Sequence, residues 1–271
     1  MNTSGARRQP QELAAQGRGP VFPRFAFSVI DRVLRTRTAT VMNVTAETPT
    51  IFSLRVARPP EFRHVAGQHL MLRLQTRQGP DMRPLSIASM PDSDELEFAT
   101  RAGPSAFKQA FMELRPGDRV KVSRPLGTFS FDRTRPAVMV AGGIGITPLR
   151  SMLLTLTTEA GDRQPVHLLF ANRSPEEIPY RVELERLAQL YSGLRITWVL
   201  PETPTSSLGA DVLTGHLDRG VLSRVAAENP RAIYYVTGPA RMVDDMTAVL
   251  RDIGLPKAHI RQSRQTFPLS H

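Results

Sequence analysis

The stretch AVMVAGGIGITPLRS, from Ala137 to Ser151, decides the fold that the sequence predicts. Its unbroken apolar run is typical of a strand that is buried on both faces, as in a parallel sheet. The run ends in glycines, after which Pro148 suits the first turn of a helix and Thr147 is placed to cap it. Glycines let a backbone approach a pyrophosphate, and a helix N-terminus offers it unpaired N–H groups. The third glycine of the common G-x-G-x-x-G fingerprint is absent, so a purely structural turn remains the alternative.

Downstream of this turn, apolar strands alternate with helices. We predict strands at residues 166–172, 194–200 and 232–238, and helices at residues 148–157, 175–190 and 240–253. This alternation predicts a doubly wound parallel sheet, whose ligands bind at the carboxyl ends of the strands. The last strand ends in Thr237-Gly238-Pro239. We therefore expect that end to share one crevice with Gly142, Gly143 and Gly145.

Upstream of the turn, short strands separated by turn signals predict an antiparallel β-barrel or sandwich. The predicted strands are residues 40–45, 51–57, 69–74, 96–101 and 119–123, and one helix lies at residues 105–114. The predicted organisation is a basic, partly disordered N-terminal extension (1–37), a β-barrel (38–133) and an α/β domain (136–271).

The barrel contains the segment RPLSIAS, from Arg83 to Ser89, which puts a cation, a proline and two hydroxyls in one row. Read alone, it is an edge strand or a bend, because proline cannot donate to a sheet ladder. Taken together with the two glycine turns, it becomes the expected seat of a flat, anionic ligand.

Composition excludes several classes of protein. The 271 residues contain no cysteine, which excludes disulfides, thiolate zinc sites and cysteine-ligated iron–sulfur clusters. His64 and His69 have no third ligand at metal-binding spacing, so we expect no metal site. The chain has too few aromatic residues among its basic ones to predict nucleic-acid binding. No apolar run is long enough to span a bilayer and no export signal is evident, so we expect a cytoplasmic protein.

The net charge of +10 is uneven, and half of it lies in residues 1–37, where seven Arg face only Glu12 and Asp31. A solvated tail is the simpler interpretation. The alternative is attraction to an acidic protein, a phosphate-bearing ligand or an anionic surface.

Three motifs in this order, RPLSIAS, GGIGITP and VTGPARM, resemble the ferredoxin–NADP⁺ reductase superfamily of flavoproteins. The resemblance implies FAD on the barrel and NADH or NADPH on the second domain. It implies that hydride passes from the nicotinamide to the flavin, and electrons then to a separate ferredoxin, flavodoxin or oxygenase component. A free-flavin or small-molecule reductase is the second enzyme hypothesis, and a nucleotide-binding interaction module without turnover is the alternative from another class.

The resemblance also assigns roles to single residues. Arg83 would pair with the flavin phosphate, and Ser86 and Thr237 would lie beside the reacting atoms. Leu85 stands where most relatives have a tyrosine on the flavin ring. The cofactor-binding residues that the resemblance implies are Arg83, Pro84, Leu85, Ser86, Thr100, Gly103, Ser105 and Ala106 for FAD, and Gly142, Gly143, Gly145, Thr147, Pro148, Arg173, Glu202, Thr237, Gly238, Pro239 and Met242 for the nucleotide.

Two charges bear on the choice of nucleotide. Glu202 follows the strand at 194–200, where a carboxylate would accept hydrogen bonds from ribose hydroxyls and repel a 2′-phosphate. Arg173 follows the strand at 166–172 and could approach the ribose or the phosphates. The sequence favours NADH, and the plain alternative is that both are loop charges.

Overall fold

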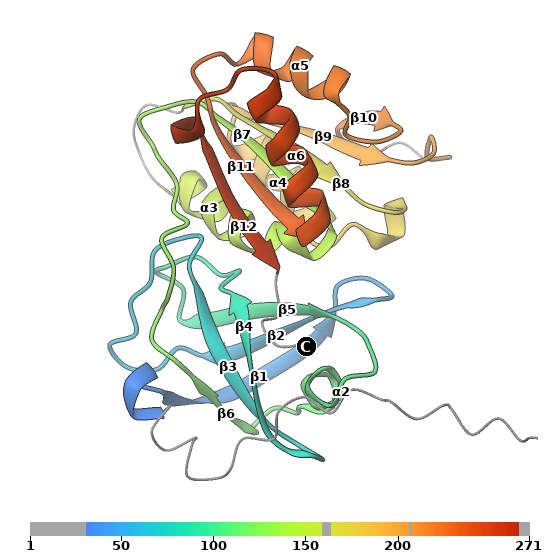
Figure 1. Ribbon diagram of the computed structural model, residues 1–271. Helices are drawn as coiled ribbons and strands as arrows, with labels where there is room; N and C mark the ends of the chain where they lie inside the picture. Colours follow the sequence, from blue (N-terminus) through green and yellow to red (C-terminus); the bar gives the residue numbers. More distant parts are fainter. Residues whose placement is uncertain (1–30, 159–163, 206–207, 266–271) are drawn as a thin grey trace, which may run out of the picture.

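The protein consists of two lobes, each built on a six-stranded sheet (Figure 1). The computed structural model describes residues 31–158, 164–205 and 208–265, so most of the predicted basic extension lies outside the described residues. Its last residues are attached to the first lobe, because Asp31 pairs with Arg73 at 3.0 Å and with Lys121 at 2.7 Å. Among the described residues, no helix is long and apolar enough to cross a membrane.

The first lobe is an antiparallel sheet in the order β4-β3-β6-β1-β2-β5. Its elements are β1 (Arg37–Ala46), β2 (Ile51–Ala57), β3 (His69–Thr76), β4 (Gly79–Ser86), β5 (Glu95–Arg101), α2 (Ala106–Glu113) and β6 (Arg119–Val122). The sheet curls until its edges meet, since the Ala88 N–H, just after β4, donates to the Glu97 carbonyl of β5 at 2.8 Å. The predicted β-barrel is thereby confirmed, with RPLS on an edge strand as its proline requires.

The second lobe is a parallel sheet in the order β10-β9-β8-β7-β11-β12. Its strands are β7 (Ala137–Gly142), β8 (Val166–Ala171), β9 (Leu194–Leu200), β10 (Asp211–Thr214), β11 (Ile233–Pro239) and β12 (Ile260–Gln265). Its helices are α3 (Ile146–Thr158), α4 (Arg181–Leu190), α5 (Arg219–Glu228) and α6 (Ala240–Asp252), with 3₁₀ turns η1 (Gly143–Gly145), η2 (Pro175–Glu177) and η3 (Lys257–His259). The predicted doubly wound sheet is confirmed.

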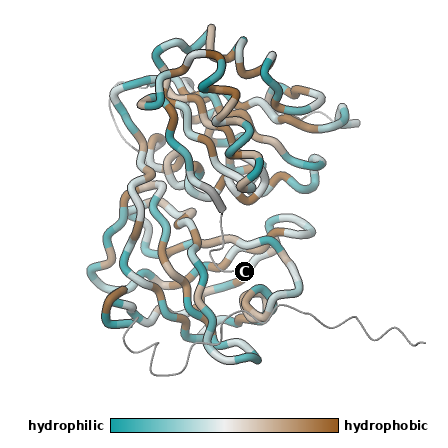
Figure 2. The backbone as a smooth tube through the Cα atoms, viewed as in Figure 1, coloured by the Kyte–Doolittle hydropathy of each residue, from teal (hydrophilic) through white to brown (hydrophobic). Residues whose placement is uncertain are grey.

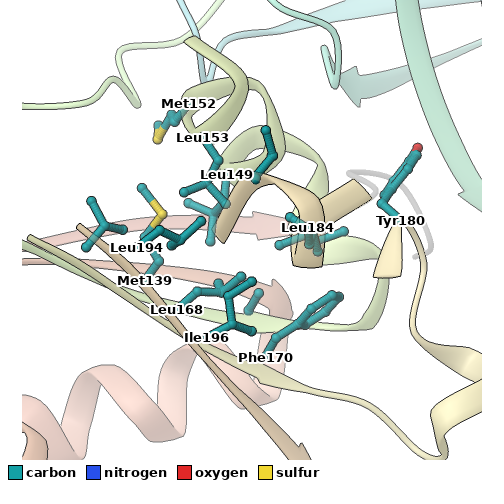
Figure 3. Packing of buried hydrophobic residues seen from close by; sticks show 14 of the residues in the cluster. Met139, Leu149, Met152, Leu153, Leu168, Phe170, Tyr180, Leu184, Leu194 and Ile196 are labelled. Carbon is teal, nitrogen blue, oxygen red and sulfur yellow. The ribbon is translucent and has the colours of Figure 1, made fainter. Parts of the chain in front are cut away.

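Strand β7 shows why its sequence is apolar without a break. All six of its residues are buried. Met139 and Ala141 pack with α3 and α4, as Figure 3 shows for Met139, Leu149 and Leu184, whereas Val138 and Val140 pack with α5 and α6 on the other face. Hydrophobic segments accordingly run through the interior of both lobes (Figure 2).

The structure differs from the sequence predictions at three points. Helix α3 begins at Ile146, so Thr147 lies inside its first turn and does not cap it. The helix predicted from residue 175 to 190 is broken, because Tyr180 has a left-handed φ of 58° between η2 and α4. The short elements β10, α5 and β12 were not predicted, because their apolar positions are few or irregular.

Candidate active site

The predicted flavin seat lies on β4, at the edge of the barrel. Arg83 pairs with Asp81 at 2.9 Å, and its guanidinium carbon lies 6.0 Å from the ring centroid of Phe107 on α2. Ser86 is opposite His69 in the antiparallel register. This places a partly exposed cation and a hydroxyl three residues apart on one edge strand, and the cation suits the phosphate of a ligand.

Leu85 is less accessible than its neighbours on β4. It is 7% exposed and belongs to the barrel core with Ile87, Phe107 and Phe111. Little of the side chain is free to cover a flavin face, so its predicted contact with the ring stays a prediction.

The start of α2 has the geometry of an anion site. Ser105 is the N-cap, and its hydroxyl oxygen accepts a hydrogen bond from the Lys108 N–H at 3.4 Å. Thr100 is buried at the end of β5, and Gly103 and Ala106 flank the cap on the way into the helix. The remaining free N–H groups of the first turn and the helix dipole favour an anion there, which fits the pyrophosphate that the resemblance implies.

The two glycine strand ends meet in the α/β domain, as predicted. A Cβ atom on Gly145 would lie 2.6 Å from the Cα of Gly238, so the backbones touch without room for a side chain. The Thr237 hydroxyl donates to the Gly145 carbonyl at 2.7 Å and is fully buried. Gly143 has a φ of +50°, which turns the chain sharply at the carboxyl end of β7. Bare backbone at two adjacent strand ends fits the phosphates of a dinucleotide.

The other predicted residues of this turn lie around the same point. The Thr147 hydroxyl donates to the Ile144 carbonyl at 3.1 Å and so tightens the turn from inside α3. Pro148 sits in the first turn of α3, where its missing N–H costs nothing. Pro239, the N-cap of α6, and Met242, in its first turn, lie over Gly142 at the carboxyl end of β7. The structure thus brings these residues together, and their contact with a nucleotide stays a prediction.

Arg173 and Glu202 stand apart from that cluster. Arg173 is exposed after β8, and Glu202 is exposed after β9. Because β8 and β9 are neighbours in the sheet, both side chains lie beyond the same carboxyl edge as the glycine turn. That position suits contact with the adenosine half of a nucleotide.

Sequence reasoning missed Arg101, which joins the two predicted seats. It lies at the end of β5, pairs with Glu177 of η2 at 3.0 Å, and has its Nη2 atom 3.3 Å from where a Cβ of Gly143 would be. Its place two residues before Gly103 is the signal that could have identified it, because a cation is useful where two phosphate sites face each other.

A cavity of about 650 Å³ also lies between the domains. It is lined by His69, Gly127, Thr128, Phe129, Arg261, Gln262 and Ser263. Burial lowers the pKa of His69, so its ring is neutral near pH 7. His69 is paired with Ser86, and the cavity therefore opens beside the predicted flavin seat.

No group of three His, Cys, Asp or Glu side chains in the described part of the chain is arranged to hold a metal ion.

Comparison with known proteins agrees with this geometry. Residues 38–131 match the family model of an oxidoreductase FAD-binding domain, and residues 139–248 match that of an oxidoreductase NAD-binding domain. FAD and a nicotinamide dinucleotide are thus the two cofactors, as predicted.

Two curated proteins are similar over most of the chain. Ferredoxin–NADP reductase B of Sorangium cellulosum is 33% identical over 206 residues, covering 73% of this chain and 84% of that protein. The ferredoxin–NAD(P)⁺ reductase component of the naphthalene 1,2-dioxygenase system of Pseudomonas putida is 28% identical over 240 residues, covering 87% of this chain and 70% of that protein.

A solved structure shares the fold. The ferredoxin–NADP⁺ reductase of Neisseria gonorrhoeae, with bound FAD and NADP, has a TM-score of 0.72 at 20% identity and covers 85% of this chain and 99% of its own. The order of barrel and α/β domain is therefore that of known two-domain reductases.

Proposed function

Because the chain belongs to the ferredoxin–NADP⁺ reductase superfamily and is an NAD(P)H-dependent, FAD-containing reductase, we propose that it oxidises NADH and reduces a separate, acidic electron-carrier protein. One observation supports this proposal above the others. The glycine turn after β7 contacts the end of β5 in the barrel, where Arg101 Nη2 lies 3.3 Å from the Cβ position of Gly143, so the predicted nucleotide site lies beside the predicted flavin site.

The flavin, when bound, supplies the hydride acceptor and the means to pass electrons on one at a time. The chain's own residues would orient the two cofactors and enclose them. Arg83 and the N-terminus of α2 would hold the negative charge of the FAD phosphates, and Ser86 would offer the flavin a hydroxyl. Thr237 keeps the β11 end against Gly145, and so fixes the backbone that would hold the nucleotide. Closely held rings with little water between them are what such a transfer needs.

The preference for NADH is supported by Glu202. Its exposed carboxylate follows β9 at the edge where an adenosine ribose would lie, and it would repel a 2′-phosphate. Arg173, beyond the neighbouring strand, would act in the opposite direction.

Replacing Glu202 by alanine tests this preference. We expect Glu202→Ala to shift the ratio of kcat/KM for NADH over NADPH towards NADPH by about tenfold, roughly the value of one charge contact. Glu228→Ala, an exposed carboxylate at the end of α5, is the control and should leave the ratio unchanged. An unchanged ratio in Glu202→Ala would remove the basis of the NADH assignment.

The acceptor is proposed from charge. A net charge of +10 attracts an acidic carrier, and attraction of this kind raises the association rate and weakens with salt. An acceptor that is a dioxygenase-type ferredoxin would match the system to which the Pseudomonas relative belongs.

Steady-state turnover tests the acceptor. NADH-driven reduction of an added acidic ferredoxin should be fast at low ionic strength and slow steeply towards 0.5 M salt, an effect on the order of tenfold or more. Reduction of free riboflavin, which has no phosphate and is uncharged at neutral pH, should change little with salt. Rapid turnover of free flavin with no response to ferredoxin would favour the free-flavin reductase instead.

A further inference from the structure

A buried arginine, Arg150, joins the two domains next to both cofactor seats. It lies on α3, four residues beyond Ile146, among the apolar residues of the α3 face. Its side chain is 5% exposed. Arginines are almost never buried unless they are fully paired. The partners of Arg150 therefore show what it does.

Two of its contacts are to the barrel. Its Nη1 atom donates to the Ala88 carbonyl at 2.9 Å and lies 3.3 Å from Glu97 Oε2 on β5. The next residue, Ser151, donates its hydroxyl to the Ser89 carbonyl at 2.6 Å. Ala88 and Ser89 lie two and three residues after Ser86 in the RPLSIAS segment. The helix of the glycine turn is thus tied to the strand of the flavin seat.

The other contacts fix the guanidinium within its own domain. Its Nη2 atom donates to Glu183 Oε1 of α4 at 2.9 Å, and its Nε atom donates to the second oxygen of that carboxylate. The ring of Tyr180 covers the guanidinium carbon at 4.3 Å. Figure 3 shows Tyr180 at the edge of the apolar cluster, with its hydroxyl directed away from the cluster. A planar fork held by a carboxylate, a ring and two barrel oxygens has one orientation.

The charges of this network are matched. Glu97, 4% exposed, also accepts a hydrogen bond from Arg55 Nε at 3.2 Å, so Arg55 and Arg150 face Glu97 and Glu183. Burying such charges costs about as much as their attraction returns, and an apolar contact of equal size is often as stable. A buried ion network is better suited to fixing one arrangement than to adding stability.

The apolar contacts between the two domains are less directional than these hydrogen bonds. The barrel contributes Ile51, Ala66 and Ala99 to the core cluster of the α/β domain. Two of these are alanines, whose contacts permit sliding by a fraction of an ångström. Directional hydrogen bonds from Arg150 and Ser151 do not permit it.

We propose that Arg150 is a positioning residue that fixes the glycine turn of the α/β domain against the β4–β5 edge of the barrel and so sets the separation of the two cofactor seats. The kinetic consequence of this inference rests on the proposed function, whereas its geometric consequence does not. The two can therefore be tested apart.

The geometric test uses distances between spin labels. The chain has no cysteine, so cysteines introduced at exposed Val65 of the barrel and exposed Arg241 of α6 take the labels uniquely. We expect a narrow distance distribution in the full-length parent and a clearly broadened one after Arg150→Met. Because that change leaves Glu97 with Arg55 alone and takes the partner from the partly exposed Glu183, the triple variant Arg150→Met, Glu97→Gln, Glu183→Gln is measured beside it and should broaden as well.

The kinetic test uses the FAD-loaded protein without labels. Misplacement of reacting groups by a fraction of an ångström to 1 Å costs up to about a hundredfold, so we expect the limiting rate of flavin reduction to fall about tenfold or more in Arg150→Met and in the triple variant. FAD content and the Kd for NADH should stay at parental values. Arg150→Lys keeps the charge but loses the fork, and should recover the rate only in part.

Two control variants distinguish the loss of domain positioning from a general effect on charge or stability. Arg195→Met removes an exposed arginine of β9 that pairs with Asp211 of β10, the strand at the sheet edge. Leu222→Ala opens the core under α5, away from the barrel, and lowers stability. Both should keep a narrow distribution and the parental rate.

The outcomes are distinct. A distribution as narrow in both Arg150 variants as in the parent overturns the inference, and so does a broadened one with an unchanged limiting rate. A parent whose flavin neither nucleotide reduces refutes the proposed function, while the distance measurement still decides whether Arg150 fixes the domains.

Discussion

At the scale of single residues, Gly145 carries the strongest constraint in the candidate site. A methyl group there would lie 2.6 Å from backbone atoms of Gly238, which cannot move without parting β7 from β11. We expect Gly145→Ala to lower the free energy of unfolding by about 1–3 kcal/mol, as overpacking does. It should abolish reduction by NADH while FAD stays bound, because the barrel is untouched.

Gly209→Ala is the matched control for that substitution. A Cβ atom at Gly209 would meet its nearest neighbour at 3.5 Å, an ordinary contact. Unfolding by urea and absorbance of bound FAD give both readouts. Gly145→Ala protein with parental stability and normal reduction by NADH would mean that the two glycines are not in contact.

Residue identities predicted the glycine turn, the RPLS segment and the start of a helix at residue 105, because each needs a residue type with a particular backbone or charge. They did not predict Arg150, Glu97 or Arg101. In the sequence, an arginine within an amphipathic helix resembles any solvated charge. Only the packing of α3 against the barrel shows that this one is buried.

At the scale of elements, the start of α2 gives Ser105 two roles, which a substitution can separate. Ser105 caps the helix, and the same helix start is the predicted pyrophosphate site. Asp is as good a cap as Ser, but it places a negative charge beside the phosphates. We expect Ser105→Asp to unfold at the parental temperature without ligand and to bind FAD about tenfold or more weakly.

Ser105→Asn is the control for capping without charge, and should keep both stability and FAD affinity. Quenching of flavin fluorescence measures the affinity. If Ser105→Asp binds FAD as tightly as Ser105→Asn, the phosphates of FAD do not lie at this helix.

Strong apolar periodicity predicted most elements of both sheets, and the exceptions have physical causes. The helix predicted from residue 175 is interrupted where Pro179 removes an N–H and Tyr180 takes a left-handed conformation over Arg150. The short strand β10 lies at the edge of the sheet and is mostly exposed, so it lacks the pattern of a buried strand. Tertiary contacts determine the secondary structure of such segments, and these contacts cannot be identified from the local sequence.

At the scale of the whole molecule, buried histidines predict how stability depends on pH. Burial lowers the pKa of His64, 3.4 Å from the Ser89 carbonyl, and of His167, 2.9 Å from the Thr197 hydroxyl. An unfolded histidine has a pKa of about 6.5, so below that pH the unfolded chain binds more protons than the folded one. These histidines therefore do not lower the free energy of unfolding above about pH 6.5, their unfolded pKa. The free energy of unfolding decreases as the pH falls from that value to their folded pKa.

We expect the Tm to decline as pH is lowered from about 7.5 to about 5.5, and His167→Asn to flatten that decline. The exposed His216→Asn serves as the control and should leave the slope unchanged. Calorimetry at a series of pH values gives the slopes. A His167→Asn variant with the parental slope would show that His167 gains its proton as easily when folded as when unfolded.

The central claim is that one molecule seats FAD on the barrel and a nicotinamide nucleotide on the α/β domain, in contact with each other. Anaerobic mixing of the FAD-loaded protein with NADH, followed by absorbance within a single turnover, tests it most directly. We predict that the flavin band bleaches completely, and faster with NADH than with NADPH. A protein that takes up no FAD, or whose flavin band is unchanged by either nucleotide, would contradict the account.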